Sequence, residues 1–322
     1  MKILFTSVGR RVELMQAFKQ AAKELNVELT LIGADITESA PALYFCDETR
    51  IVCRIKDENY IPMLLEICKK DQIDCLIPTI DTDLLLLAEN KEKFEAIGTK
   101  VLISAVDKVK LCRDKRFTAD YFISLGLKSP QPVDDVEAYN MGYPAFIKPK
   151  DGSSSVDAYK VTNEKDLRTY AGKIADYIIQ PFISGREFTI DIFCDYEGNP
   201  VYITPRERLA VRAGEVLKTQ ICQNDVMIAE MQTLIKDYKP CGQITVQLIQ
   251  DEATGDNYYI EINPRFGGGA PLSIKAGADS AKAVIKMLAG ETLSYEEKAA
   301  RDKAVYSRFD QSICVDEGIK AC

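Results

Sequence analysis

The spacing of apolar residues changes about a third of the way along the chain, and this change limits the folds available to it. In the first hundred residues, short apolar strand candidates alternate with helix candidates, the clearest spanning residues 11–25 and 60–71. Strands separated by helices pair in parallel through right-handed crossovers. We therefore predict a doubly wound α/β domain over residues 1–106. Its predicted strands are residues 2–6, 29–34, 51–53, 75–78 and 100–103, and a third helix is predicted at 84–97.

The region after residue 130 has a different pattern, in which strand candidates dominate and helices interrupt them irregularly. This order predicts an α+β region of antiparallel strands. Its predicted strands are residues 143–149, 156–161, 177–180, 187–195, 201–204, 244–250 and 257–263. Its predicted helices are residues 164–174, 225–238 and 277–289.

Composition removes several classes of function. The chain has 322 residues and no histidine, which excludes a Ser-His-Asp triad, a Cys-His dyad and a His-ligated zinc site. Its net charge of −8 argues against a sequence-independent nucleic-acid binder. No apolar run is long enough to cross a membrane, and the ten cysteines are scattered with no CxxC pair. We therefore expect a cytoplasmic protein with reduced cysteines and neither a nucleic-acid nor a membrane partner.

The strongest local signal is a pair of strand candidates joined by the turn-rich residues 251–256. A hairpin centred on Thr254 places apolar residues opposite apolar ones and polar residues opposite polar ones. The predicted pairs are Gln247 with Glu261, Leu248 with Ile260 and Val246 with Ile262. Alternation along the strand also predicts that Glu261 and Asn263 share a face.

That polar face is a candidate metal site. One carboxylate and two amide oxygens, from Glu261, Gln247 and Asn263, are hard oxygen ligands that suit Mg²⁺. The alternative is a solvated polar sheet face. Arg265 and the glycine run at 267–269 follow at once and favour a ligand site, since glycines let a backbone approach a ligand closely.

Two further segments are weak when taken alone. Lys148 ends a strand candidate that runs into the Gly/Ser-rich residues 150–155, a composition that presents donors to phosphates but is equally typical of a surface hairpin loop. No GxxxxGK[ST] motif is present, so this is not a P-loop. Residues 178–191 predict a strand, a short linker and a second strand, which could form a hinge between subdomains; adenine sites often use linker backbone groups, with a carboxylate for the ribose hydroxyls.

The order of these segments closely resembles the ATP-grasp superfamily, and in particular single ATP-grasp ligases similar to the carbamoyl phosphate synthetase large subunit. The resemblance covers nearly the whole chain and rests on Asp114-Lys115, residues 143–155, Gln180 to Glu187, Gln247 and Glu261-Ile262-Asn263-Pro264-Arg265. It implies an ATP-grasp fold preceded by a Rossmann-like pre-ATP-grasp domain. The implied ATP-grasp domain spans residues 107–322, with a mobile lid subdomain at about 128–181 and a catalytic subdomain at about 182–322.

The resemblance also implies roles for individual residues. Lys115 and Lys148 resemble the lysines that contact phosphates, and Arg265 the residue that steadies the transferring phosphoryl group. Gln247, Glu261 and Asn263 resemble the magnesium ligands. The remaining implied ATP contacts are the loop Gly152, Ser153, Ser154 and Ser155, the adenine contacts Gln180, Phe182 and Ile183, and the ribose carboxylate Glu187.

The implied activity is ATP-dependent ligation of a carboxylate to an amine through an acyl phosphate, with Mg²⁺ or Mn²⁺. The alternatives are a non-catalytic or regulatory ATP-binding protein of the same fold, and a carbamoyl-phosphate-synthetase-type subunit. A dinucleotide-dependent oxidoreductase is disfavoured because no GxGxxG follows the first strand candidate. The implied partners are small, amino-acid-like carboxylates and amines, and a homodimer is left open.

Residues at strand ends are the candidates for substrate binding. Arg10 and Arg11 follow the first strand candidate, at the edge of a parallel sheet where ligands tend to bind, although a solvated helix turn is the alternative. Asp81 and Asp83 follow another strand candidate and suit either an amine or a helix N-cap. Arg206, Arg208 and Arg212 lie in a stretch predicted to be a loop that could line the acyl-phosphate site, and the alternative is that exposed arginines there are merely solvated.

Overall fold

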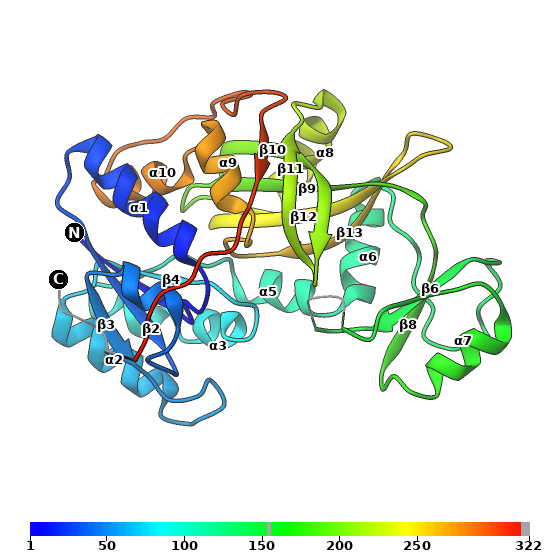
Figure 1. Ribbon diagram of the computed structural model, residues 1–322, viewed down its shortest axis with the longest axis horizontal. Coiled ribbons are helices and arrows are strands. Elements are labelled where there is room, and N and C mark those ends of the chain that lie inside the picture. The colour runs from blue at the N-terminus through cyan, green and yellow to red at the C-terminus, as the bar shows by residue number, and fades with distance from the viewer. Residues whose placement is uncertain (153–155, 317–322) are drawn as a thin grey trace.

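The computed structural model describes residues 1–152 and 156–316 and contains three β-sheets (Figure 1). A five-stranded sheet forms the N-terminal part, a six-stranded sheet the centre of the molecule, and a three-stranded sheet projects from the far side.

The N-terminal sheet is entirely parallel and has the strand order β3-β2-β1-β4-β5. The chain order reverses between β1 and β4, which is where open α/β sheets bind ligands. Its strands are β1 (Lys2–Thr6), β2 (Thr30–Asp35), β3 (Glu48–Ile51), β4 (Cys75–Pro78) and β5 (Lys100–Val101). Its helices are α1 (Val12–Leu25), η1 (Pro41–Phe45), α2 (Tyr60–Asp71), α3 (Leu84–Glu89) and α4 (Lys91–Glu95).

The predicted parallel domain is present, with two local corrections. The third strand ends at Ile51 instead of beginning there. The single helix predicted at 84–97 is two short helices that meet at Asn90, whose Nδ2 donates to the carbonyl of Leu86 at 2.8 Å. Asparagine competes with helical backbone bonds in this way, which explains the break.

The rest of the chain forms two antiparallel sheets. The central one has the order β13-β12-β9-β10-β11-β14, and the projecting one has the order β7-β6-β8 with helix α7 (Glu164–Ala171). The central strands are β9 (Gly185–Cys194), β10 (Pro200–Arg212), β11 (Glu215–Ile221), β12 (Gly242–Asp251), β13 (Asn257–Asn263) and β14 (Val305–Ser307). The projecting strands are β6 (Ala145–Pro149), β7 (Tyr159–Val161) and β8 (Tyr177–Pro181). The remaining helices are α5 (Val106–Arg113), α6 (Lys115–Ser124), α8 (Asp225–Tyr238), α9 (Ala270–Ala276) and α10 (Ser280–Leu288).

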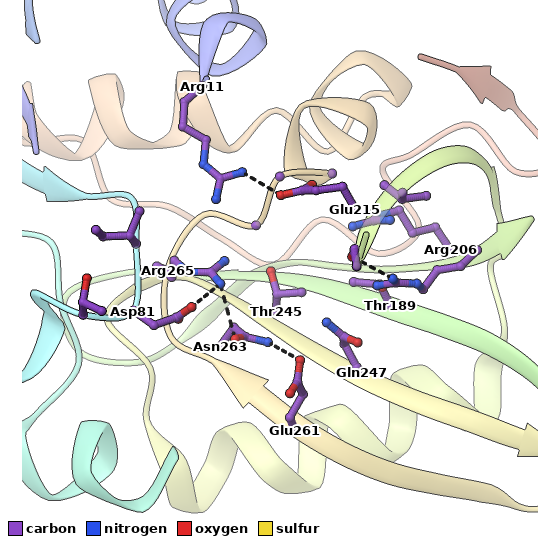
Figure 2. A pocket seen from close by; sticks show the side chains of 18 residues that line it. Arg11, Asp81, Thr189, Arg206, Glu215, Thr245, Gln247, Glu261, Asn263 and Arg265 are labelled. Atoms are coloured by element: carbon purple, nitrogen blue, oxygen red, sulfur yellow. Dashed lines mark hydrogen bonds and ion pairs between the residues drawn. The ribbon is translucent and has the colours of Figure 1, made fainter. Parts of the chain in front are cut away.

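Each face of the central sheet has a different role. One face packs its apolar side chains, such as Ile190 and Val246, against the buried side of α8, including Met231 and Leu234. On the opposite face, polar side chains point into a cavity (Figure 2). Alternation along antiparallel strands produces this division.

A shared core joins the N-terminal domain to the end of the central sheet. Helix α1 packs on α9 and α10, and the ring of Phe18 lies 5.9 Å from that of Phe266 in an edge-on arrangement. Phe266 directly follows Arg265, so this packing positions Arg265 against the N-terminal sheet.

The β12–β13 hairpin confirms two predicted pairs and corrects one. Gln247 pairs with Glu261 and Val246 with Ile262, but Leu248 pairs with Tyr259, so Ile260 is the extra residue of a β-bulge. Tyr259 faces α8, where its hydroxyl donates to Glu230 at 2.7 Å. Without the extra residue, alternation would place Glu261 on that same face. The bulge therefore directs Glu261 to the cavity.

The stretch containing Arg206, Arg208 and Arg212 is not a loop. It belongs to β10, which runs from buried residues at its start to exposed ones at its end, with irregular pairing to β11 between Arg208 and Val211. The fading burial removes the alternation that would have marked a strand in the sequence.

No helix of the described residues is long and apolar enough to span a membrane. The nine described cysteines are all free thiols, and five of them are buried, as expected for small core residues.

Candidate functional site

A cavity of about 320 Å³ lies between the central sheet and the carboxyl edge of the N-terminal sheet (Figure 2). This volume is at the lower end of the usual range for small-molecule sites, about 300–1,000 Å³. The N-terminal domain supplies part of the wall. The lining residues are Arg11, Ile80, Asp81, Thr82, Thr189, Arg206, Arg208, Gly214, Glu215, Val216, Thr245, Gln247, Glu261, Asn263, Arg265, Gly267, Gly268 and Gly269.

The floor of the cavity is a row of side chains across four neighbouring strands. Glu261 on β13 pairs with Gln247 on β12, Gln247 with Thr189 on β9, and Thr189 with Arg206 on β10. Asn263 lies two residues after Glu261 on β13 and pairs with Thr245, which lies two residues before Gln247 on β12. This pair extends the same face. The row runs from a carboxylate and an amide at one end to a guanidinium at the other (Figure 2).

The predicted metal ligands lie together at the first end of this row. Nδ2 of Asn263 donates to Oε1 of Glu261 at 3.0 Å, and Gln247 is the direct cross-strand neighbour of Glu261. No cluster of three or more His, Cys, Asp or Glu side chains suited to a metal occurs among the described residues. The donors are one carboxylate and two amide oxygens, a set that fits Mg²⁺, which completes its octahedron with phosphate oxygens and water.

Arg265 is held beside these residues by contacts from two domains. Its Nη2 lies 2.6 Å from Oδ2 of Asp81, which follows β4 in the N-terminal domain, and 3.4 Å from Oδ1 of Asn263. Its Nη1 donates to the carbonyl of Phe266 at 3.3 Å. These bonds fix the guanidinium at the cavity wall next to the candidate metal ligands.

The two predicted phosphate lysines come from outside the cavity lining. Lys148 on β6 is buried, and within the described residues its ammonium has no hydrogen bond or ion pair. Burial lowers the pKa of Lys148 to about 8, against the opposing influence of Glu261. Lys115 opens α6, its Nζ donates to the carbonyl of Gly152 at 2.9 Å, and burial also lowers its pKa. A buried cation without an anion is suited to receive a phosphate.

The predicted adenine and ribose contacts lie on the projecting sheet and the start of β9, away from the cavity lining. Gln180 is buried and its Nε2 donates to the carbonyl of Pro130 at 2.5 Å. The amide of Phe182 donates to Pro144 at 3.1 Å, and Ile183 follows in the connection to β9. Glu187 lies 3.3 Å from Nε of Arg208. Ser153, Ser154 and Ser155 lie outside the described residues.

Three of the five predicted substrate residues line the cavity, and the other two do not. Arg11, Asp81 and Arg206 line the cavity, whereas Arg10 is exposed and does not. Asp83 is fully buried, accepts bonds from Thr6 Oγ1 at 2.9 Å and Tyr60 OH at 3.2 Å, and makes no N-cap bond.

Burial raises the pKa of the Asp83 carboxyl to about 6. This carboxyl is not among the groups that line the cavity. The geometry therefore leaves Asp81, but not Asp83, in reach of a ligand there.

Several cavity residues were not predicted as site residues from the sequence. Thr189 and Thr245 lie within apolar strand candidates, where threonine is an ordinary strand residue. Glu215 lies 3.5 Å from Nη1 of Arg11, and its only signal in the sequence is its nearness to the arginines at 206, 208 and 212. Arg208, which the sequence did indicate as a residue that could line the site, does so, with its Nη2 donating to the carbonyl of Gly214 at 3.0 Å.

Family models match both parts of the chain. Residues 3–102 match the "PylC-like, N-terminal domain", and residues 173–310 match "ATP-grasp in the biosynthetic pathway with Ter operon". The chain thus matches a PylC-like N-terminal domain followed by an ATP-grasp domain, and its curated relatives include carbamoyl phosphate synthases. Among curated relatives, the carbamoyl phosphate synthase large chain, N-terminal section, of Aquifex aeolicus is 27% identical over 95% of this chain. The chain spans 60% of that relative's length.

Solved structures have the same fold at low sequence identity. The biotin carboxylase domain of 2-oxoglutarate carboxylase from Hydrogenobacter thermophilus, a dimer in complex with MgADP, ADP and bicarbonate, matches with a TM-score of 0.73 and 19% identity. The match covers 94% of this ATP-grasp chain and 73% of that chain. An L-amino acid ligase from Bacillus licheniformis matches with a TM-score of 0.70 and 17% identity, over 89% of this chain and 74% of that one.

Proposed function

We propose that this protein is an ATP-dependent carboxylate–amine ligase that acts through an acyl phosphate. The observation that carries the proposal is the sheet face on which Gln247, Glu261 and Asn263 lie beside Arg265 in one cavity. Lys148 supports it, because its buried ammonium lies over the Phe146 ring and has no ion pair with any described residue, which suits a phosphate. The match of residues 173–310 to an ATP-grasp model supports ATP as the source of that phosphate.

Glu261, Asn263 and Gln247 would hold Mg²⁺, and the same oxygen donors would accept Mn²⁺. The metal would supply positive charge between the phosphate groups of ATP. We assign Lys115, Lys148 and the loop Gly152–Ser155 to the phosphates, and Gln180, Phe182 and Ile183 to the adenine. Glu187 is assigned to the ribose. Apart from Lys115 on α6, these residues belong to the proposed lid, about residues 128–181, and to its junction with the catalytic subdomain at 182–322. All of them lie within the proposed ATP-grasp domain, residues 107–322, which follows the pre-ATP-grasp domain 1–106.

The proposed chemistry has two steps. A carboxylate oxygen of the acid substrate attacks the γ-phosphorus of ATP, the bond to the β–γ bridging oxygen breaks, and ADP leaves. The amine nitrogen then attacks the acyl carbon and displaces phosphate, which can take the proton that the nitrogen loses. Arg265 and Lys148 would stabilise the charge on the phosphoryl oxygens, the largest contribution a protein makes to such a transfer.

The substrates we propose are amino-acid-like small molecules. The cavity mixes Arg11, Arg206 and Arg208 with Asp81 and Glu215, which suits a ligand that carries both carboxylate and ammonium groups. The L-amino acid ligase with this fold is consistent with that class. Arg10 and Asp83 lie outside the cavity, and Asp83 would act on it only through the loop after β4. A homodimer is also proposed, and the mass of the protein in solution tests it.

A screen for ADP release tests the proposed function. Purified protein with Mg²⁺ and ATP is incubated with carboxylic acids and amino acids, singly and in pairs, and products are identified by mass spectrometry. Hydroxylamine added in place of the amine should trap the acyl phosphate as a hydroxamate. ADP release that requires both an acid and an amine supports the proposal. A protein that binds Mg²⁺-ATP but releases no ADP with any pair would instead be a regulatory ATP-binding protein.

A carbamoyl-phosphate-synthetase-type reaction is the second candidate, favoured by the match to a carbamoyl phosphate synthase section along 95% of this chain. The same screen separates the two functions. ADP release with bicarbonate and ammonia alone would support this second candidate. ADP release that needs an organic carboxylate would support the ligase.

A further inference from the structure

The far end of the cavity floor carries a guanidinium that is only partly used by the protein. Arg206 is buried, and its Nε donates to Oδ2 of Asp191 at 2.8 Å. Asp191 is itself fixed by Ser273 Oγ at 2.6 Å and Thr245 Oγ1 at 3.2 Å. Gly269 packs so closely that a Cβ there would collide with Nη2 of Arg206. One edge of this guanidinium is therefore held rigidly.

The other edge faces the cavity without a partner. Within the described part of the chain, Nη1 of Arg206 and the hydroxyl of Thr189 are buried and have no hydrogen bond. The two residues are direct cross-strand neighbours, and both line the cavity (Figure 2). Arg208 lies next along the same strand face and adds positive charge beside them, while its own Nε lies 3.3 Å from Oε2 of Glu187. Buried donors without acceptors are costly unless a ligand supplies the acceptors.

These donors stand apart from the candidate metal ligands. Arg206 is two strands from Gln247 and three from Glu261. Since neighbouring strands lie about 4.8 Å apart, the separation is roughly 10–14 Å. A carboxylate bound at Arg206 is therefore not the one that is phosphorylated near Glu261 and Arg265.

We propose that Arg206, Thr189 and Arg208 bind the carboxylate of an α-amino acid that serves as the amine substrate, and that this carboxylate stays free in the product. The inference rests on the proposed ligase function. A planar carboxylate accepts two parallel hydrogen bonds, one from Nη1 of Arg206 and one from the Thr189 hydroxyl. Its negative charge balances a cation that Asp191 only partly neutralises.

Thr189→Val tests the proposal with little risk to folding. It keeps the shape of the side chain and removes a hydroxyl that has no hydrogen bond to any described residue, so the melting temperature should stay the same or rise. The KM for the amino acid acceptor should rise about tenfold with kcat nearly unchanged, because the lost bond contributes to binding and not to phosphoryl transfer. Arg206→Lys, which keeps a positive charge for Asp191, should raise that KM further.

Thr99→Val is the matched control, since the buried Thr99 hydroxyl donates to the carbonyl of Ile73 at 2.8 Å, outside the cavity. It should lower the melting temperature and leave the KM unchanged. The substrate arm compares each active amino acid with its α-carboxamide, which should lose most of the ADP release.

Two results would overturn the inference while leaving the ligase function in place. One is equal use of amino acids and their carboxamides, and the other is an unchanged acceptor KM in Thr189→Val. Absence of ADP release with every acid–amine pair would instead remove the proposed function itself. In that case, binding of L-alanine against L-alaninamide to the Mg²⁺-ADP-loaded protein, read by thermal shift, decides the carboxylate site. Equal stabilisation by the two probes would count against it.

Discussion

Two hairpins lie on either side of β9 in the cavity floor, and the sequence predicts one of them much better than the other. The β12–β13 hairpin shows alternating residue types and a turn-rich connection in its sequence, and it carries Gln247, Glu261 and Asn263. The β10–β11 hairpin carries Arg206, Arg208 and Glu215, but its first strand passes from full burial to full exposure and its pairing is irregular. Alternation marks a strand only where one face is buried along its whole length.

The comparison separates two kinds of site chemistry. The metal end is assembled from residues close together in sequence, so residue types and spacing already indicate it. The arginine end becomes a site only when β9 and β10 pair, α9 covers Arg206 with Gly269, and Asp191 fixes one edge of the guanidinium. We therefore expect substitutions at the metal end to lower turnover. Substitutions at the arginine end should weaken substrate binding or leave activity unchanged.

Glu261→Gln gives the largest expected effect. The change keeps the size and hydrogen bonding of the side chain but removes the one carboxylate among the three candidate metal ligands. We expect turnover to fall by about 10²–10³ with little change in melting temperature, because a well-placed charge is lost and no core packing is disturbed. Glu252→Gln, at the exposed turn of the same hairpin, is the control. Near wild-type turnover of Glu261→Gln would show that the β12–β13 hairpin does not carry the catalytic metal site.

Arg265→Ala should have the next largest effect, lowering turnover by about 10² with a smaller loss of ATP affinity. The reason is that Arg265 is placed beside the candidate metal ligands to act on the transferring phosphoryl group. Asp81→Asn should shift kcat in the same direction but less, because it loosens the 2.6 Å contact that holds Arg265. Measured kcat and ATP Kd for both variants check this order. Equal losses in ATP affinity and turnover would assign Arg265 to ground-state binding.

Lys148 extends the comparison to pH. Burial lowers its pKa to about 8, so the ammonium that would bind phosphate is charged below pH 8 and neutral above it. The Kd for Mg²⁺-ATP should therefore weaken about tenfold between pH 7 and pH 9. Lys148→Gln should bind more weakly at pH 7 and lose this pH dependence. A wild-type Kd that is constant over this range would contradict the assignment.

A rise in pH should weaken ATP binding through Lys148, but it should increase the stability of the folded protein through the same residue. Its folded pKa lies below its unfolded value, so the unfolded chain binds more protons between about pH 8 and pH 10.4. The contribution of Lys148 to the free energy of unfolding should rise with pH in that window. Denaturant titrations of the wild type and Lys148→Gln at pH 8 and pH 10 measure the difference.

Arg212→Ala should have the smallest effect. Arg212 ends β10 and forms an exposed ion pair with Asp310 at 3.0 Å, outside the cavity lining. Exposed pairs of this kind contribute about 0–1 kcal/mol, so both turnover and melting temperature should stay near wild type. A loss of activity comparable to that of Arg265→Ala would mean that the whole of β10, and not only its buried half, forms the site.

The amount that the sequence predicted varies with how local each feature is. The helices at 60–71 and 225–238 and the strands at 2–6, 75–78 and 257–263 have the predicted bounds, because strong periodicity and nearby turn residues define them. The register error at Leu248 arose because a β-bulge inserts a residue without changing the pattern of residue types. The pairing of Arg265 with Asp81, 184 residues away, had no signal in the sequence at all.

By itself, the sequence determined the parallel N-terminal sheet, the antiparallel region and the set of oxygen ligands on one hairpin. Each of these follows from spacing within a few residues, where side-chain periodicity and turn chemistry act. Only the tertiary structure decided that Glu261 faces the cavity and not α8, that Asp83 is buried, and that Arg206 presents a free edge beside Thr189. Those outcomes depend on a bulge, on burial and on pairing between distant strands, and such long-range contacts leave no periodic trace in a chain.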